Sequence, residues 1–198
     1  VEYALVAQGQ HSRRVQEIID ACRAKGIPVR FAPRAALDRE AGTAHHQDVV
    51  AVCSAKAYDD LETLLASCER PLLVVLDSVE DPGNLGAIVR TAVAAGSDGL
   101  VIPARRAAGL SPAVARAAAG ALEHLKIARV TNLVGALEEL KQRGVWIYGF
   151  EAQAEKSYLD LDYAGACALV FGGEGRGLHR LVREACDVVA RIPLYGPA

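Results

Sequence analysis

Apolar and polar positions alternate along the chain in a way that predicts strands and helices in turn. Short apolar runs bounded by glycine, proline or polar residues predict strands, and apolar positions three or four apart predict helices between them. The most hydrophobic run, residues 72–76 (LLVVL), is apolar throughout, which indicates a strand buried on both faces of a parallel sheet. The other predicted strands cover residues 3–7, 27–31, 49–53, 99–102, 126–130, 145–150, 168–171 and 188–192.

Helices are predicted between these strands. Ser12 is expected to cap a helix that ends at Gly26. The apolar stripe of this helix consists of Val15, Ile18, Ile19 and Cys22. The remaining helices are predicted near residues 35–40, 59–65, 84–95, 111–121, 133–143 and 178–185.

The alternation of predicted strands and helices is interrupted at residues 67–71 and then begins again, so we expect two α/β units. The first, residues 1–70, would be a small domain of its own. The second, residues 71–198, would be a mostly parallel sheet covered by helices. Ligands of such sheets bind beyond the carboxyl ends of the strands, so the loops at those ends are the candidate sites.

Composition narrows the class of protein. Of the 198 residues, 52% are hydrophobic and the net charge is −2, so the chain is too apolar for intrinsic disorder. No run approaches the roughly 18 consecutive apolar residues of a membrane span, and we expect no membrane partner. The near-neutral charge argues against nonspecific binding of nucleic acid but is compatible with a local basic patch.

Metal binding and disulfides are not predicted either. The five cysteines are odd in number and have no paired spacing, which favours a reduced cytoplasmic protein over a disulfide framework or a zinc site. His45 and His46 are adjacent in a polar stretch, and we expect them in a solvated loop.

The first candidate segment, residues 77–90 (DSVEDPGNLGAIVR), follows the most hydrophobic strand. Residues 81–83 predict a tight turn that leaves Asn84 at the N-cap of a helix. Arg90 lies about 120° around that helix from Asn84. The spacing alone is also compatible with a capped helix that carries a solvated arginine.

Two further segments follow strands. Residues 172–177 (GGEGRG) place glycines around Glu174 and Arg176, and glycine lets the backbone approach a ligand closely. Their spacing fits neither a Walker phosphate loop nor the dinucleotide fingerprint. A loop that holds a nucleoside-like ligand and a plain glycine-rich turn both remain open. The third segment is residues 192–197 (IPLYGP).

Together these segments resemble the motifs of the SpoU/TrmH class of SPOUT RNA ribose 2′-O-methyltransferases. Residues 77–90 are similar to motif 1, as D-x-x-x-D-P-x-N-x-G-x-I-x-R. Residues 171–178 (FGGEGRGL) resemble motif 2, and residues 192–196 resemble the opening of motif 3. The first unit resembles the L30e-type RNA-binding domain found before this catalytic domain in ribosomal RNA members, through residues 8–10 (QGQ) and 46–51 (HQDVVA).

The resemblance covers essentially the whole chain. It implies a trefoil-knotted α/β domain, S-adenosylmethionine as cofactor, and a homodimer with the active site at the subunit interface. The residues that it implies for catalysis are Asn84, Arg90 and Glu174, and those that it implies for cofactor binding are Gly172, Gly173, Ile192 and Leu194.

The chain departs from the family in two places. Motif 3 of the family continues beyond the position of Ala198 into a stretch that closes the knot, and the chain contains no methionine, so we expect residues to be missing at both ends. Asp48 stands where relatives with this loop commonly have glycine.

The implied reaction is methylation of a ribose 2′-hydroxyl in RNA. A guanosine of 23S rRNA is favoured because ribosomal RNA members carry the N-terminal domain. The alternatives are a transfer RNA methyltransferase and a relative that binds RNA without catalysis. We also expect an asymmetric basic surface shared across the dimer.

The implied roles can be weighed chemically. Arginine stays charged to about pH 12, so we expect Arg90 to hold a phosphate and stabilise negative charge on the reacting oxygen rather than to act as a base. We expect Glu174 to fix the glycine-rich loop by accepting backbone N–H bonds. Asn84 is expected to order the motif 1 turn and to contact RNA.

Overall fold

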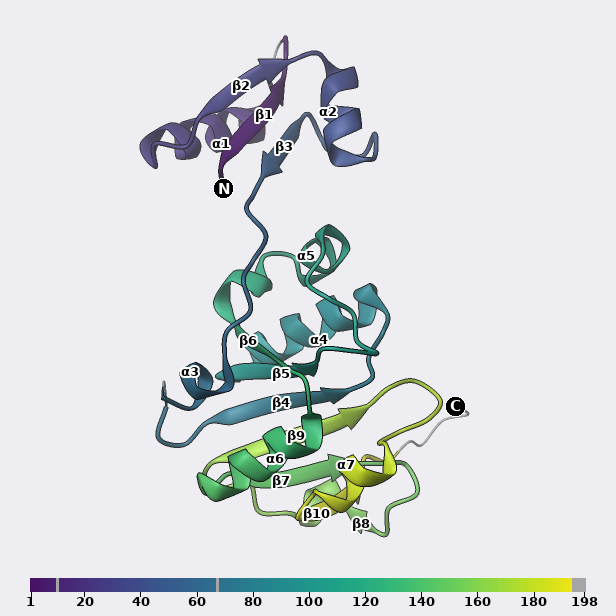
Figure 1. Ribbon diagram of the computed structural model, residues 1–198. Helices are drawn as coiled ribbons and strands as arrows, with labels where there is room; N and C mark the ends of the chain where they lie inside the picture. The colour runs from purple at the N-terminus through teal and green to yellow at the C-terminus, as the bar shows by residue number, and fades with distance from the viewer. Residues whose placement is uncertain (10, 67, 194–198) are drawn as a thin grey trace. The chain divides into compact units, whose positions relative to one another are not determined.

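The computed structural model describes residues 1–9, 11–66 and 68–193, and it divides the chain into two compact units, Val1–Lys56 and Ala57–Ala198 (Figure 1). The sequence pattern placed the boundary near residue 70. Residues 57–70 instead belong to the second unit, because Leu61 and Leu64 are buried in its core.

The N-terminal unit is a three-stranded sheet in the order β2-β1-β3, with β1 parallel to β2 and antiparallel to β3. Ser12 caps α1 by accepting the backbone N–H of Val15, as predicted. Val15 and Ile19 of this helix are buried, but Ile18 is 43% exposed, since the narrow sheet covers only part of the predicted stripe. The elements are β1 (Tyr3–Ala7), α1 (Arg13–Ala24), β2 (Val29–Ala32), α2 (Arg34–Ala41) and β3 (Val49–Val52).

Asp48, the residue found where relatives commonly have glycine, has a positive φ of 66°. This left-handed conformation is easiest for glycine, and aspartate is one of the few other residues that adopt it at modest cost. The departure from the family pattern is therefore compatible with the same turn.

The second unit is built on a seven-stranded sheet in the order β6-β5-β4-β9-β7-β10-β8, and all of its neighbouring strands are parallel. This confirms the predicted α/β class. The strands are β4 (Leu72–Asp77), β5 (Gly99–Pro103), β6 (Lys126–Val130), β7 (Trp146–Phe150), β8 (Lys156–Ser157), β9 (Cys167–Gly172) and β10 (Val188–Arg191). The helices are α3 (Leu61–Ala66), α4 (Pro82–Ala94), α5 (Pro112–Ala118), α6 (Leu133–Gln142) and α7 (Arg180–Glu184), with the 3-10 helices η1 (Ala121–His124) and η2 (Tyr158–Asp160).

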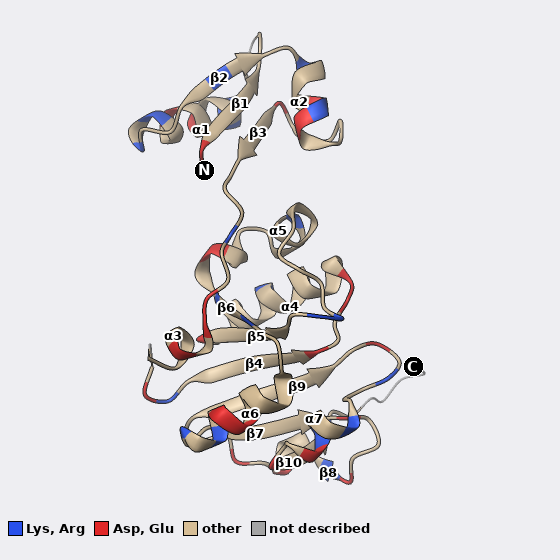
Figure 2. Ribbon diagram, viewed as in Figure 1, with Lys and Arg blue, Asp and Glu red and all other residues tan. Residues whose placement is uncertain are grey.

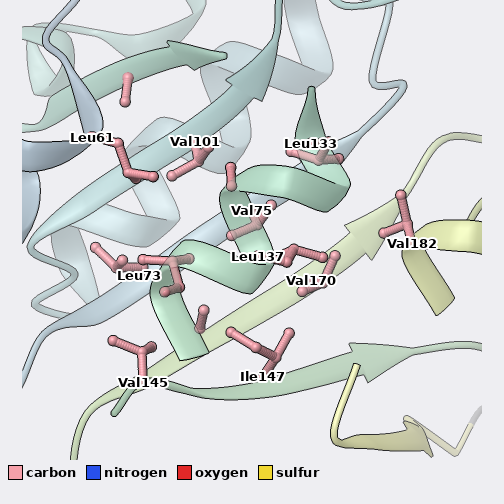
Figure 3. Packing of buried hydrophobic residues seen from close by; sticks show 14 of the residues in the cluster. Leu61, Leu73, Val75, Val101, Leu133, Leu137, Val145, Ile147, Val170 and Val182 are labelled. Atoms are coloured by element: carbon pink, nitrogen blue, oxygen red, sulfur yellow. The ribbon is translucent and has the colours of Figure 1, made fainter. Parts of the chain in front are cut away.

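Both faces of this sheet are covered, which explains why residues 72–76 of β4 are all apolar. Leu73 and Val75 pack with α3, α6 and α7 in one core (Figure 3). Val74 and Leu76 point the other way and pack with α4, α5 and η1. Side chains alternate across a strand, so burial on both faces favours apolar residues at successive positions of β4, and only Asp77 at its end is charged.

Two helices differ from the prediction at their ends. Helix α4 begins at Pro82, and its N-cap is Asp81, whose carboxylate accepts the backbone N–H of Asn84 at 2.7 Å. The predicted N-cap at Asn84 is therefore wrong, because proline suits the first helical position and the aspartate before it reaches the free N–H groups. Helix α5 ends at Ala118, where Ala119 and Gly120 adopt positive φ angles.

The strand order places a crevice at the carboxyl ends of β4 and β9. The chain runs from β4 outward through β5 to β6, whereas β9 returns to the other side of β4. Open α/β sheets bind ligands at such a reversal. Within the described residues, no helix is both long enough and apolar enough to cross a membrane.

Candidate functional site

A cavity of about 690 Å³ opens at this crevice. Three loops line it: the segment between β4 and α4, the segment between β9 and α7, and the segment between β5 and α5. The first two loops are the candidate motif 1 and motif 2 segments. Its volume lies in the range of sites for small organic ligands, about 300–1,000 Å³.

The predicted polar residues of the two motifs meet at the cavity. The side-chain amide of Asn84 donates a hydrogen bond to the carboxylate of Glu174, and both residues line the cavity. Among the described residues, no backbone N–H donates to the Glu174 carboxylate, contrary to the expectation. Asn84 therefore connects the two motifs, and the ordering of the motif 1 turn belongs to Asp81.

The glycine-rich loop is folded too tightly for side chains at its start. A Cβ built on Gly172 would lie 2.1 Å from the carbonyl carbon of Gly177, and one on Gly173 would lie 2.2 Å from the carbonyl oxygen of Ser78. The backbone N–H of Gly177 returns to the oxygen of Gly173 at 3.2 Å. Gly175 and Gly177 have positive φ angles, so the turn uses the freedom of glycine.

Asp77 and His179 hold this loop against the end of β4, a connection that the sequence reading missed. Asp77 is 4% exposed, and among the described residues it is the only polar or charged one that is buried, backbone included. Its carboxylate accepts the backbone N–H of His179 at 2.7 Å and lies 2.9 Å from the imidazole Nδ1. Ser78 Oγ donates to the same carboxylate at 3.3 Å. The sequence did contain a signal for this connection, because Asp77 is a charged residue at the end of an otherwise apolar strand. A carboxylate that is buried there needs hydrogen-bond donors from another part of the chain.

The predicted cofactor residues are only partly gathered at the cavity. Gly172 and Gly173 line it. Ile192 does not, and it is 47% exposed. Leu194 lies outside the described residues.

Arg90 also stands apart from the cavity lining. It is an exposed residue of α4, and its guanidinium makes no hydrogen bond or ion pair with the described residues. The arginines that do line the cavity are Arg106 and Arg176. Arg106 follows β5, and the rule that ligands bind beyond carboxyl strand ends could have identified it from the sequence.

No group of three or more potential metal ligands occurs in the part of the chain that the structure describes. In the N-terminal unit, His45 is exposed, as expected. The side chain of His46 is only 2% exposed, so the expectation of a solvated residue is wrong there. Its Nε2 lies 2.9 Å from Asp38, and its Nδ1 accepts the backbone N–H of Asp48 at 3.0 Å, so that it closes the loop before β3.

Comparison with protein families assigns both units. Residues 71–198 match the SpoU rRNA Methylase family. Residues 1–59 match the family described as RNA 2′-O ribose methyltransferase substrate binding.

Named relatives extend over nearly the whole chain. A putative TrmH family tRNA/rRNA methyltransferase of Bacillus subtilis is 43% identical over 195 residues, which are 96% of this chain and 78% of the relative. A 23S rRNA (guanosine-2′-O-)-methyltransferase of Xylella fastidiosa is also 43% identical, over 97% of this chain and 79% of the relative.

Solved structures show the same architecture. The SpoU methyltransferase AviRb of Streptomyces viridochromogenes, solved in complex with AdoMet, has a TM-score of 0.82 and 26% identity, over 100% of this chain and 75% of that one. An AdoMet-bound rRNA methyltransferase of Sinorhizobium meliloti has a TM-score of 0.76 and 25% identity, over 100% of this chain and 72% of that one.

Proposed function

Because this chain belongs to the SpoU rRNA methylase family, we propose that it transfers a methyl group to a ribose 2′-hydroxyl of RNA. One observation carries the proposal beyond family membership. Asn84 of motif 1 and Glu174 of motif 2 are hydrogen-bonded above a cavity at the switch point of the sheet. The polar groups of the two motifs therefore meet at one cavity, and this arrangement supports the proposed reaction.

S-adenosylmethionine is the methyl donor, and when bound it supplies a methyl group on a positively charged sulfur. The glycine-rich loop fits such a ligand, since its backbone at Gly172 and Gly173 lines a cavity of about 690 Å³. We assign cofactor contacts to these two residues together with Ile192 and Leu194.

The favoured substrate is a guanosine of 23S rRNA. Relatives that are 40–43% identical over almost the whole chain carry that activity in their names, and the N-terminal residues match a substrate-binding family of RNA ribose methyltransferases. We assign the N-terminal unit to RNA binding and the C-terminal unit to catalysis. Transfer RNA is the alternative substrate.

The residues of the chain would act by orientation and charge. Glu174, held by Asn84, positions the loop that lines the cavity. Arg90 has no partner within the described chain, so its guanidinium is free to hold a phosphate and to stabilise negative charge on the 2′-oxygen. This assignment gives Arg90 an electrostatic role and no role as a base.

A homodimer, the trefoil knot and a cytoplasmic location complete the proposal. Arg90 lies outside the cavity lining, and a second subunit could complete the site around it. Among the strands that the structure describes, the last in chain order, β10, lies between β7 and β8 and not at the sheet edge, which suits a chain that threads back. Ribosomal RNA as substrate favours the cytoplasm. Sedimentation velocity would test the dimer, and a monomer at assay concentrations would contradict it.

The test of the reaction combines tritium-labelled S-adenosylmethionine with a 23S rRNA transcript or a tRNA transcript. We expect label in the 23S transcript. Arg90→Ala should lower kcat by about 100-fold or more, the usual effect of removing one group that stabilises transition-state charge. S-adenosylmethionine binding, measured by calorimetry, should remain.

Arg90→Lys separates the two roles of the arginine. We expect a lower rate with an unchanged pH–rate profile, since neither side chain titrates near neutral pH. A profile that shifts with the lysine would identify Arg90 as the base. Label in tRNA alone would contradict the proposed substrate, and a protein that binds no S-adenosylmethionine would contradict the enzyme itself.

A further inference from the structure

The loop between β5 and α5 carries two consecutive arginines, Arg105 and Arg106. Both are exposed, but only Arg106 lines the cavity. Figure 2 shows this loop as a basic stretch, on the side of the sheet where the β4–α4 loop is acidic. Neither arginine belongs to the three motifs of the sequence.

The loop is fixed at its beginning. Ala104 donates its backbone N–H to the carbonyl oxygen of Val130 at 2.8 Å. The carbonyl oxygen of Ala104 accepts a hydrogen bond of 2.7 Å from the guanidinium of Arg129. Because both the N–H and the carbonyl group of Ala104 are held, the arginines that follow leave β5 in a defined direction.

The loop is also fixed after the arginines. Ala108 donates its backbone N–H to the carbonyl oxygen of Val79, in motif 1, at 2.8 Å. Leu110 donates its backbone N–H to the hydroxyl of Tyr58 at 2.8 Å. The β5–α5 loop is thus hydrogen-bonded to the motif 1 segment that lines the cavity, and this bond fixes the position of one loop relative to the other.

Between these anchors, Arg106 has a positive φ of 56°. A residue with a Cβ rarely adopts this left-handed conformation, and such strain persists only where the surrounding structure enforces it. Ser78, on the opposite loop of the cavity, is left-handed as well. The turn separates Arg106 from Arg105 and brings only the former to the cavity.

The guanidinium of Arg106 makes no hydrogen bond or ion pair with the described residues. Three acids of the described chain line the cavity with Arg106: Asp81 caps α4, Glu174 accepts from Asn84, and Glu80 is exposed and makes no ion pair with Arg106. A positioned arginine without a partner suits an anion, and its planar fork matches the oxygens of a phosphate.

We propose that Arg106 binds a backbone phosphate of the substrate RNA at the mouth of the cavity. This rests on the proposed function, and it adds a residue outside the known motifs that positions the RNA. The alternative anion for Arg106 is the carboxylate of S-adenosylmethionine. Arg106 is exposed, which favours RNA as its ligand, because RNA can approach from solvent. Gly172 and Gly173, which we assign to the cofactor, are less exposed.

The experiment compares Arg106→Ala with Arg105→Ala, a matched variant that removes the same charge from the neighbouring position. Binding of the 23S transcript is measured by filter binding at several salt concentrations, without any need for turnover. We expect Arg106→Ala to weaken RNA binding about tenfold and to reduce the slope of log K against log salt by about one. Arg105→Ala should change the affinity less and leave KM for RNA unchanged.

Two further measurements separate the sources of the anion and the effect on folding. Calorimetry with S-adenosylmethionine alone should give the wild-type Kd for Arg106→Ala, and a weakened Kd would assign the arginine to the cofactor carboxylate. Arg106→Gly relieves the left-handed strain, so it should unfold no earlier than the wild type and still bind RNA weakly.

Equal RNA affinities of the Arg105 and Arg106 variants, or an unchanged salt slope for Arg106→Ala, would overturn this inference. The proposed function would stand in that case, provided that the wild type labels RNA. A wild type that binds neither the 23S transcript nor the tRNA transcript would overturn both.

Discussion

Asp77 shows how one carboxylate can determine the shape of the site. It is buried at the end of β4, and its hydrogen bonds reach across to the backbone and imidazole of His179, 102 positions later in the chain. A buried carboxylate is stable only when it is hydrogen-bonded, and the donors that it satisfies would be left unpaired without it. The pair therefore fixes where the motif 2 loop ends.

We expect Asp77→Ala to lower the free energy of unfolding by about 2–4 kcal/mol, since a buried N–H group loses its acceptor and the side chain leaves a void. Asp77→Asn keeps an acceptor oxygen and should cost less. Urea denaturation measures both, and Asp160→Ala, at an exposed position, is the control. A wild-type urea midpoint for Asp77→Ala would show that the pair does not stabilise the fold.

The cysteines differ from one another at this scale. All five are free, and their burial varies from exposed Cys53 to buried Cys167. Burial raises the pKa of the Cys186 thiol to about 11. A thiol with so high a pKa is almost fully protonated at neutral pH, so Cys186 acts as a small packing residue beside Gly149.

At the scale of elements, helices α4 and α5 illustrate a close contact that a helical pattern cannot reveal. Gly86 lies within α4, where glycine is normally unfavourable. A Cβ at this position would lie 2.4 Å from the Cβ of Ala117 and 2.9 Å from the backbone nitrogen of Ala118, both on the α5 helix. The glycine allows the two helices to approach each other.

Gly86→Ala sets two effects against each other. Alanine would gain about 1 kcal/mol of helix propensity, whereas overpacking costs about 1–3 kcal/mol. Because one of the atoms met is backbone and cannot rotate away, we expect overpacking to prevail and the unfolding temperature to fall. Gly135→Ala in α6 would meet only the side chain of Asn132, 3.0 Å away, and should be milder. A stability gain for Gly86→Ala would contradict this packing.

Sequence patterns predicted the strands better than the ends of the helices. Each predicted strand is present within one or two residues of its expected bounds, because a buried strand needs an apolar run wherever it lies in the sheet. Helix ends depend on which side chain reaches the free backbone groups. At α4 the N-cap is Asp81 and not the expected Asn84, and periodicity does not show which of the two takes that role. The two-residue strand β8 carries no pattern at all.

At the scale of the whole molecule, the chain separates into two units joined by residues 53–57, which belong to no helix or strand and are mostly exposed. We expect limited trypsin digestion to cut first after Lys56, because cleavage requires a segment that can leave its hydrogen bonds at little cost. Mass spectrometry identifies the cut. Lys56→Gln should abolish it, and an earlier cut at Arg105 or Arg106 would contradict the anchoring of their loop.

Some features of this protein depend on residues that are neighbours in the sequence, and others depend on residues that are far apart in it. Apolar periodicity and the motifs are properties of neighbouring positions, so the sequence alone predicted the α/β class, the strands and the candidate residues Asn84 and Glu174, whose expected hydrogen bonds differ from those in the structure. It predicted neither the pairing of Asp77 with His179 nor the arrival of Arg106 at the same cavity.

Those features depend on which strands lie side by side. Leu72–Asp77 pairs with Cys167–Gly172 across more than half of the second unit, and that pairing sets Asp77 level with Gly172. The contacts at the site are therefore long-range consequences of strand order, and strand order is decided by how all the buried faces pack together. The sequence by itself determined the elements and the reactive residue types. Only the tertiary structure decided which of those residues share one cavity.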